Sequence, residues 1–310
     1  MIPNETRRID LHLPRGWHDC STEQLEMIAA AIIVEQQRVD RYHPFDWTRV
    51  KVRLFFAMTG LEVCHTESTE GTDGDVAYMV RFRRGDKRPF PIYVWQVHAC
   101  IEHLAWLDDQ KATMPKMMFP YPRRIRRWSW RFWQRDYYAP GELLDGMSWQ
   151  TYRWLNDWLE AYTAANNRLA AARHSNSAER FSREETKALI QQERNIRLTV
   201  LSLIFGCPKW RIRLVRFTEP QWQVVLFWWS SMMQYLKQQY PKCFKSGSPR
   251  KRKQVQSLPI ELYTQSMAVL VTDLKLTEDE VNHLTAHVIL RRLNTMALDA
   301  EEMEKLKHKR

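Results

Sequence analysis

The stretch SREETKALIQQERNIRLTVLSLIFG, residues 182–206, decides the fold class of this chain. Ser182 followed three residues later by Glu185 is the pattern of a helix capping box, and Gly206 and Pro208 are suited to ending a helix. The last turns, residues 200–205, are apolar on all sides, which is typical of a helix surrounded by other elements. We therefore expect a long, central helix in a mainly α protein.

Helical spacing of apolar residues recurs along most of the rest of the chain. Ser21 with Gln24 and Thr277 with Glu280 are further capping boxes, and Gly60 follows an amphipathic segment that opens at Asp46. The spacing predicts helices at about residues 22–38, 46–59, 95–108, 148–172, 219–240 and 259–275, with a last one from Thr277. These helices, with a single hairpin, indicate a mainly α architecture.

Two segments change to the alternating period of a strand. Residues 76–82 and 90–94 flank a Gly-Asp-Lys turn and predict a small β-hairpin, whose second arm should be an edge strand because Pro89 and Pro91 cannot donate hydrogen bonds. Residues 65–75 before it are expected to form a polar loop. Residues 209–217, KWRIRLVRF, alternate for long enough to predict a short strand.

The predicted domain organisation has two helical lobes. Residues 1–108 form an N-terminal lobe with the hairpin, and residues 148–310 form a C-terminal helical lobe. Between them, residues 109–147 contain several prolines and glycines and predict an Arg/Trp-rich connector. A basic linker with Gly, Ser and Pro occupies residues 242–257 of the second lobe.

Cysteine usage and hydropathy bear on where the protein works. The five cysteines are odd in number and contain no Cys-x-x-Cys pair, which favours reduced thiols in a cytoplasm. The N-terminal stretch has no apolar run of signal-peptide length, and the strongest apolar run, 224–233, spans about half of the roughly 20 residues that a membrane crossing needs. We expect a cytoplasmic protein with no membrane segment.

The positive charge is concentrated in two places. The chain has a net charge of +11, with eight basic residues and no acid in 111–135, and six basic residues and no acid in 242–254. Without these fourteen cations the remainder of the chain carries −3. The basicity therefore belongs to two local patches and not to the whole surface.

The first patch includes the stretch PYPRRIRRWSWRFWQRDYY at 120–138, where arginines alternate with aromatic rings. Three interpretations remain open: a platform for single-stranded nucleic acid, an interface for a protein partner, and a structural anchor in which arginine stems cover buried rings. The candidate binding residues are Arg123, Arg124, Arg126, Arg127, Trp128, Trp130, Arg131 and Trp133.

The second patch, KSGSPRKRKQ, carries no aromatic residues. A solvated linker explains it better than a phosphate contact, and its secondary candidates are Arg250, Lys251, Arg252 and Lys253. A helix-turn-helix at the C-terminus is disfavoured because the helix that would enter DNA opens with three acids, residues 278–280.

Motifs for catalysis and cofactor binding are not found in the sequence. It contains no phosphate loop, no G-x-G-x-x-G and no H-E-x-x-H. His98, Cys100 and His103 are potential metal ligands, but helical spacing places His98 away from the other two. We expect no metal, no cofactor and no enzymatic activity.

The order of several segments resembles a family of uncharacterised proteins encoded in prophages and related mobile elements of Bacteroidetes. The segments that carry the resemblance are LPRGWHDCSTEQLEMIA at 13–29, DWTRVKVRLFFAMTGL at 46–61, YRWLNDWLEAY at 152–162, VLSLIFGCP at 200–208, LFWWSSMMQYLKQQYPKCFK at 226–245, LPIELYTQSMAVL at 258–270 and LTEDEVNHLTAHVILRRLNTMALDAEEMEK at 276–305. The resemblance as a whole covers most of the chain, but its motifs are helix-packing signatures, and no catalytic residues come with it. The stretch at 120–138 departs from the family pattern.

The resemblance implies a noncatalytic role in bacteriophage morphogenesis. The expected partner is another protein, such as a tail or tape-measure protein that a tail-assembly chaperone would hold in the host cytoplasm, with association with the virion a further expectation. Methionine pairs such as Met232 and Met233 would line an adaptable apolar groove or belong to the core. The alternative function is nucleic-acid binding through residues 120–138. The sequence does not define the oligomeric state.

Overall fold

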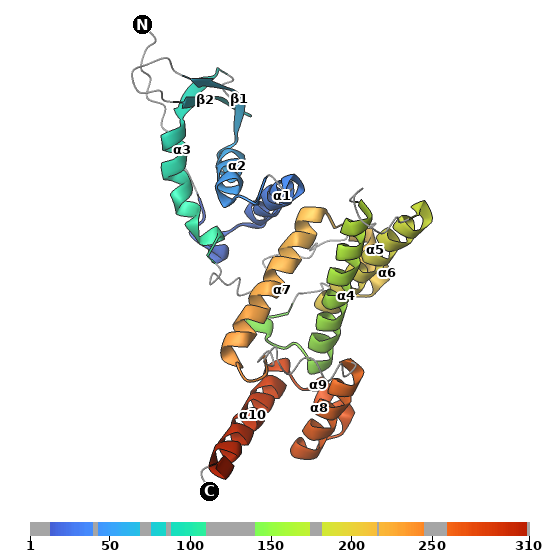
Figure 1. Ribbon diagram of the computed structural model, residues 1–310. Coiled ribbons are helices and arrows are strands. Elements are labelled where there is room, and N and C mark those ends of the chain that lie inside the picture. Colours follow the sequence, from blue (N-terminus) through green and yellow to red (C-terminus); the bar gives the residue numbers. More distant parts are fainter. Residues whose placement is uncertain are drawn as a thin grey trace, which may run out of the picture. The chain divides into compact units, whose positions relative to one another are not determined.

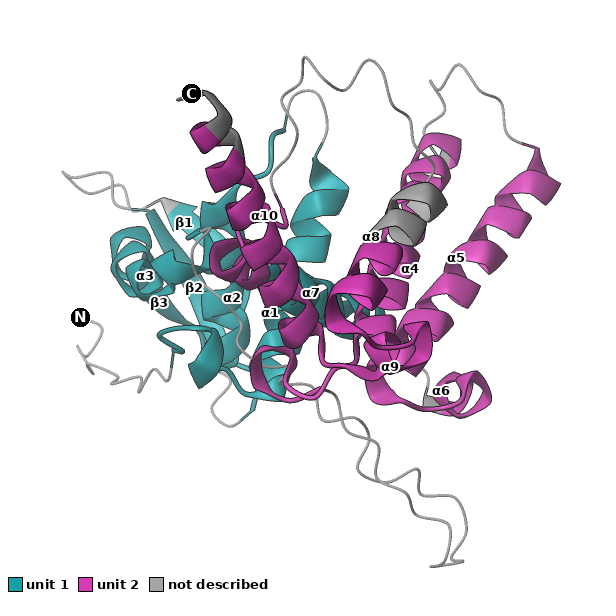
Figure 2. Ribbon diagram, turned by 90° about the horizontal axis from the view of Figure 1, so that it is seen from below, with its two compact units in different colours: residues 1–119, 217–231 teal, residues 120–216, 232–310 magenta. Residues whose placement is uncertain are grey.

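The structure is a computed structural model that describes residues 13–39, 43–68, 76–84, 88–109, 140–173, 182–215, 217–244 and 259–308. The fold is mainly α with one small antiparallel sheet, as the sequence predicts (Figure 1). The chain divides into two compact units (Figure 2): residues 1–119 with 217–231 form unit 1, and residues 120–216 with 232–310 form unit 2. Residues 110–139 of the predicted connector at 109–147 lie outside the described part of the chain, so the lobe boundaries stay a prediction.

The helices of unit 1 begin and end where local signals place them. After a 3-10 turn at Trp17–Asp19, α1 (Thr22–Arg38) opens with the predicted capping box, in which the Ser21 side chain accepts from the backbone N–H of Gln24. Helix α2 (Trp47–Thr59) is capped by Asp46 and ends at Gly60, whose φ of 69° is left-handed. Helix α3 (Val94–Ile101) continues into a 3-10 segment, Glu102–Leu107.

The sheet of unit 1 contains three strands in the order β1 (Leu61–Ser68), β2 (Val76–Phe82) and β3 (Phe90–Tyr93). Strands β2 and β3 are the predicted hairpin, and β3 is an edge strand as its prolines require. Seven buried residues from α2, the three strands and α3 form the sheet core: Phe55, Phe56, Leu61, Val80, Ile92, Val97 and Ile101.

Unit 2 is built from helices. They are a 3-10 turn at Glu142–Leu144, α4 (Trp149–Arg173), α5 (Arg183–Phe205), α6 (Lys209–Val215), α8 (Pro259–Leu274), α9 (Glu278–His283) and α10 (Ala286–His308). Helices α4 and α5 pack along each other. The capping boxes at Ser182 and Thr277 form as predicted, and Gly206 ends α5 with a left-handed φ of 58°.

Helix α7 (Glu219–Gln239) runs through both units, because residues up to 231 belong to unit 1 and those from 232 to unit 2. Its first turn carries a reciprocal cap: the Thr218 backbone N–H donates to Gln221 Oε1 at 3.0 Å and the Gln221 backbone N–H donates to Thr218 Oγ1 at 3.4 Å. Met232 is fully buried, which favours the core interpretation of this methionine over the groove.

Three sequence-based expectations for secondary structure are wrong. The short strand predicted at 209–217 is instead α6, where only Ile212 is buried while Trp210 and Leu214 face outward together one helical turn apart. The polar loop predicted from residue 65 is instead strand as far as Ser68. Backbone pairing with β2 stabilises this strand, although its side chains are polar.

The single helix predicted from Thr277 is broken into α9 and α10, although no glycine or proline stands at the break. Two backbone hydrogen bonds with the segment before α4 replace helical ones there. The Trp149 N–H donates to the Leu284 carbonyl at 2.7 Å, and the Ala286 N–H donates to the Met147 carbonyl at 2.9 Å. Tertiary pairing therefore overrides the local helical preference.

Candidate functional site

The residues predicted from sequence to bind a partner lie outside the described part of the chain. This holds for Arg123, Arg124, Arg126, Arg127, Trp128, Trp130, Arg131 and Trp133, and equally for Arg250, Lys251, Arg252 and Lys253. Their roles stay predictions.

Unit 2 carries another surface that combines exposed tryptophans with cations, as the predicted binding stretch at 120–138 does. Along α4 the side chains of Tyr152, Leu155 and Leu159 point into the unit and are buried, as their spacing predicts. A different side of α4 carries Trp154 and Trp158, which remain 45% and 37% exposed. They stand one helical turn apart, so both indole rings lie on one face of the helix.

Helix α6 adds cations and a third exposed indole. Its sequence KWRIRLV contains three cations and no acid. Ile212 anchors the helix with 1% exposure, which directs the opposite side to solvent and leaves Trp210 61% exposed. The Arg211 guanidinium lies 5.0 Å from the centre of the Trp210 ring, a cation–π distance.

A small cavity joins these helices. It has a volume of about 210 Å³ and is lined by Trp158 of α4, by three residues of α5 and by two cations of α6: Asn195, Leu198, Thr199, Lys209 and Arg213. The Lys209 ammonium lies 5.8 Å from the centre of the Trp158 ring. The Thr199 hydroxyl donates to the Asn195 carbonyl at 2.9 Å, which turns its polar group away from the opening. We call the exposed set Trp154, Trp158, Lys209, Trp210 and Arg213 the α4–α6 face.

The charge of this face is not neutralised inside the described part of the chain. Neither Lys209 nor Arg213 forms an ion pair with a described acid, although Lys51, Lys242, Arg49, Arg81, Arg197 and Arg292 all do. A cation beside exposed aromatic rings attracts carboxylates and phosphates, and the rings add apolar contact area. The cavity is smaller than the roughly 300–1,000 Å³ of small-molecule sites, so its size suits one side chain of a larger partner.

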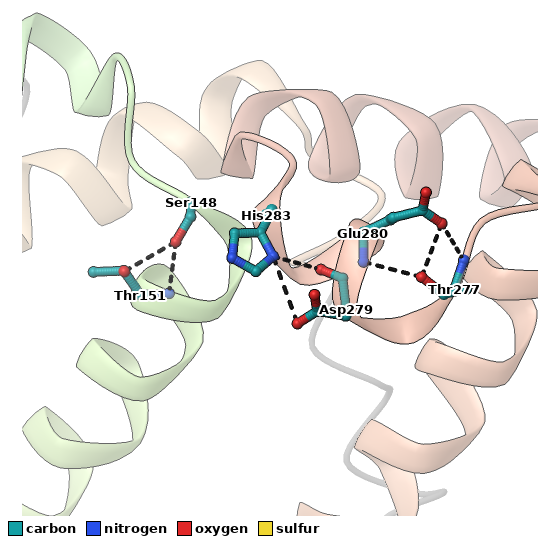
Figure 3. Close-up of polar contacts among 6 residues, drawn as sticks. All are labelled: Ser148, Thr151, Thr277, Asp279, Glu280 and His283. Atoms are coloured by element: carbon teal, nitrogen blue, oxygen red, sulfur yellow. Dashed lines mark hydrogen bonds and ion pairs between the residues drawn. The ribbon is translucent and has the colours of Figure 1, made fainter.

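Serine, histidine and aspartate also occur near one another, at the start of α4 and within α9 (Figure 3). Ser148 Oγ accepts from the Thr151 backbone N–H at 3.2 Å and donates to Thr151 Oγ1 at 2.9 Å. His283 Nδ1 lies 2.7 Å from the Asp279 carbonyl oxygen and 3.6 Å from its carboxylate. The side-chain hydrogen bonds of Ser148 therefore go to Thr151 at the start of α4, and the His283 side chain contacts Asp279 of its own helix, so these side chains support the ends of the two helices.

A second polar cluster fixes the turn before α4. His287 Nε2–H donates to the Leu143 carbonyl at 2.6 Å, and the Tyr240 hydroxyl donates to His287 Nδ1 at 3.0 Å. The turn needs this support because Leu143 and Leu144 have φ values of 55° and 68°, which are costly for residues with a side chain. The cluster therefore holds a strained turn in place.

Three thiols, those of Cys20, Cys100 and Cys243, are not activated as nucleophiles. Burial, aided by the neighbouring Asp19 charge, raises the pKa of the Cys20 thiol to about 12. Burial also raises the pKa values of Cys100 and Cys243 above their ordinary range. These thiols stay protonated at neutral pH, and the five cysteines are free of disulfides.

Metal sites and membrane-spanning helices are absent from the described residues, and no relatives of the chain were found. The described residues contain no group of three or more His, Cys, Asp or Glu placed to hold a metal ion. Within the same residues, every helix is too short or too polar to cross a bilayer. Comparisons with protein-family models, with curated proteins and with solved structures found no match to this chain.

Sequence reasoning missed the α4–α6 face for a definable reason. Trp154 and Trp158 are one turn apart and lie outside the predicted inward stripe of α4, so their exposure could have been found from the spacing alone. Trp210 could not, because the predicted strand placed it on one face with Ile212. The cavity needs three helices together, and no local pattern reports that.

Proposed function

We propose that this chain is a noncatalytic protein that binds another protein through the α4–α6 face, and that it serves in bacteriophage morphogenesis. The single observation that carries the binding role is the exposed Trp158 beside Lys209 and Arg213, two cations that form no ion pair with a described acid. Trp154 of α4 and Trp210 of α6 are exposed on the same two helices. The morphogenesis role is supported by the resemblance of the segment order to prophage-encoded proteins. A cytoplasmic helper or tail component fits both.

The energetics favour a protein partner for such a surface. Tryptophan and arginine are the residues that most often dominate protein interfaces, where one truncation costs about 2 kcal/mol or more. Indole side chains on ordered helices have few rotatable bonds to immobilise when a partner covers them, which lowers one of the costs of binding. The α4–α6 face therefore has the composition of an interface centre.

The test uses coexpression of the full chain with the proteins encoded by its neighbouring genes. We expect the chain to be recovered in a complex with another protein chain, either one of these or a second copy of itself, and we expect Trp154→Ala, Trp158→Ala and Trp210→Ala each to weaken that complex by about 30-fold, the equivalent of about 2 kcal/mol. Trp95→Ala is the matched control, because Trp95 of α3 is 59% exposed and belongs to unit 1.

Titration calorimetry at two salt concentrations separates the two classes of partner. An interface centred on indoles should keep most of its affinity at high salt, whereas nucleic acid held through 120–138 should dissociate steeply. The proposal fails if the three tryptophan variants bind as the wild type does. It also fails if a single-stranded oligothymidylate is bound through the same face and no protein is.

A further inference from the structure

The C-terminal half of α10 exposes a second surface that the other described residues leave uncovered. Near its start, α10 is anchored by Ala286, Ile289 and Leu290, which are 1%, 0% and 3% exposed. Towards its end Leu298, Met303 and Leu306 are 41%, 57% and 59% exposed. Large apolar side chains this exposed on an ordered helix mark an interaction site when they fall on one face.

These residues do share a face, and acids lie among them. Leu298, Glu302 and Leu306 follow at i, i+4 and i+8, and Asp299 and Met303 follow at i and i+4 in the adjacent row. Asp299 and Glu302 are exposed. We call these five residues the α10 stripe.

The α10 stripe and the α4–α6 face are opposite in charge and alike in apolar content. The face presents Lys209 and Arg213 next to indole rings, and neither cation has an ion pair among the described residues. The stripe presents Asp299 and Glu302 next to leucine and methionine side chains. Leucine and methionine are the kind of unbranched or flexible apolar groups that fill a small cavity beside an aromatic ring.

We infer that the protein bound by the α4–α6 face is a second copy of this chain, whose α10 stripe occupies the face. Both surfaces are exposed within one chain, so the contact forms between copies. Met303 or Leu306 would enter the cavity beside Trp158, while Asp299 and Glu302 pair with Lys209 and Arg213. This inference rests on the proposed function, because it names the partner of the same face.

The geometry of such a contact has a consequence for assembly. The two surfaces differ, so the contact is heterologous: each copy offers one face and one stripe. Repetition gives head-to-tail chains or closed rings, and two copies that exchange stripes give a dimer with two contacts. One helical stripe makes a small interface, which places the dissociation constant in the range of about 1–100 μM.

Sedimentation velocity of the full chain over a concentration series measures this assembly. We expect the wild type to gain mass as its concentration rises through the micromolar range. The face variant Lys209→Glu with Arg213→Glu and the stripe variant Asp299→Lys with Glu302→Lys should each weaken self-association by at least about 10-fold, because like charges then oppose each other.

Mixing the two variants is the decisive measurement. The acidic face of one variant complements the basic stripe of the other, so the mixture should form a one-to-one complex that neither variant forms alone. Arg183→Glu with Lys187→Glu is the matched control, because it makes the same charge change at i and i+4. These two residues lie at the start of α5, where Arg183 is about 18 Å along the helix from Asn195. This control should associate as the wild type does.

The outcomes separate the inference from the proposed function. A wild type that stays monomeric at all concentrations, or a mixture that fails to associate while circular dichroism shows both variants folded, overturns the inference. If the tryptophan variants still lose a protein from a neighbouring gene, the proposed function stands without it. If the face variant loses only oligothymidylate binding, both fail.

Discussion

Large aromatic side chains differ in exposure between the sheet core of unit 1 and the α4–α6 face of unit 2. In the sheet core, Phe55 and Phe56 are buried, and Phe56 meets Tyr78 edge to face with ring centres 5.3 Å apart. On the α4–α6 face, Trp154, Trp158 and Trp210 remain exposed. The same class of residue therefore stabilises the sheet core and adds little to the packing of α4 and α6. For Trp210, only the folded arrangement of the chain distinguishes these two situations.

The largest expected effect breaks the sheet core. Phe55→Ala should lower the free energy of unfolding by about 3–5 kcal/mol, because it removes a buried ring and leaves a cavity. Trp210→Ala should change it by less than about 0.5 kcal/mol, because the ring is exposed. Urea denaturation followed by circular dichroism measures both. Equal effects of the two substitutions would contradict the contrast between core and face.

A smaller effect is expected at the left-handed glycines that end one helix in each unit. Gly206→Ala and Gly60→Ala should each cost about 1–2 kcal/mol. An added methyl group meets no atom within 4 Å at either site, so backbone strain is the whole cost. Asparagine tolerates this conformation better and should cost less at the same positions. Alanine variants as stable as the wild type would show that these helix ends relax.

The smallest effect is a difference between the units in their response to acid. The α1 capping box uses the neutral Gln24, whereas those of α5 and α9 use Glu185 and Glu280. Hydrogen bonds from the backbone and hydroxyl of Ser182 lower the pKa of the Glu185 carboxyl, and those of Thr277 do the same for the pKa of Glu280. Their stabilisation is complete above the unfolded pKa of about 4.3 and is lost as the pH falls through the lowered folded pKa.

Urea midpoints measured from about pH 7 down to about pH 3 test this difference. We expect the double variant Glu185→Gln with Glu280→Gln to lose less stability on acidification than the wild type, because glutamine accepts the same hydrogen bonds without titrating. Gln24→Glu should add an acid-sensitive box to α1. Identical pH profiles for wild type and double variant would rule out a contribution of these carboxylates.

Helices with strong end signals were predictable from sequence. Capping boxes at Ser21, Ser182 and Thr277, and closing glycines at 60 and 206, act through neighbouring residues and need no tertiary context. The failures come from longer-range causes. The alternating sequence of α6 fits the period of a strand, but the segment is a helix with Ile212 buried and Trp210 and Leu214 exposed, which the local period does not predict. The break at Leu284 depends on backbone pairing with residues far away in sequence.

The candidate site was predictable in kind but not in place. Interleaved arginines and aromatic rings at 120–138 point to a binding surface, and the described surface of unit 2 combines the same residue types at Trp158, Lys209 and Arg213. Their convergence depends on how α4, α5 and α6 pack. The charge distribution along the sequence does not single out α6 as a basic patch, because α6 carries only three of the forty-seven cations.

The passage of α7 through both units constrains the order in which the chain can mature on a ribosome. Unit 1 needs residues 217–231, so it stays incomplete until most of unit 2 up to residue 216 has emerged. Part of the apolar surface of unit 1 therefore stays exposed to solvent until residues 217–231 are synthesised, in contrast to domains that fold one after another during synthesis. Each unit consists of two separate stretches of sequence, so a truncation that removes the chain after residue 119 removes unit 2 and also leaves unit 1 incomplete.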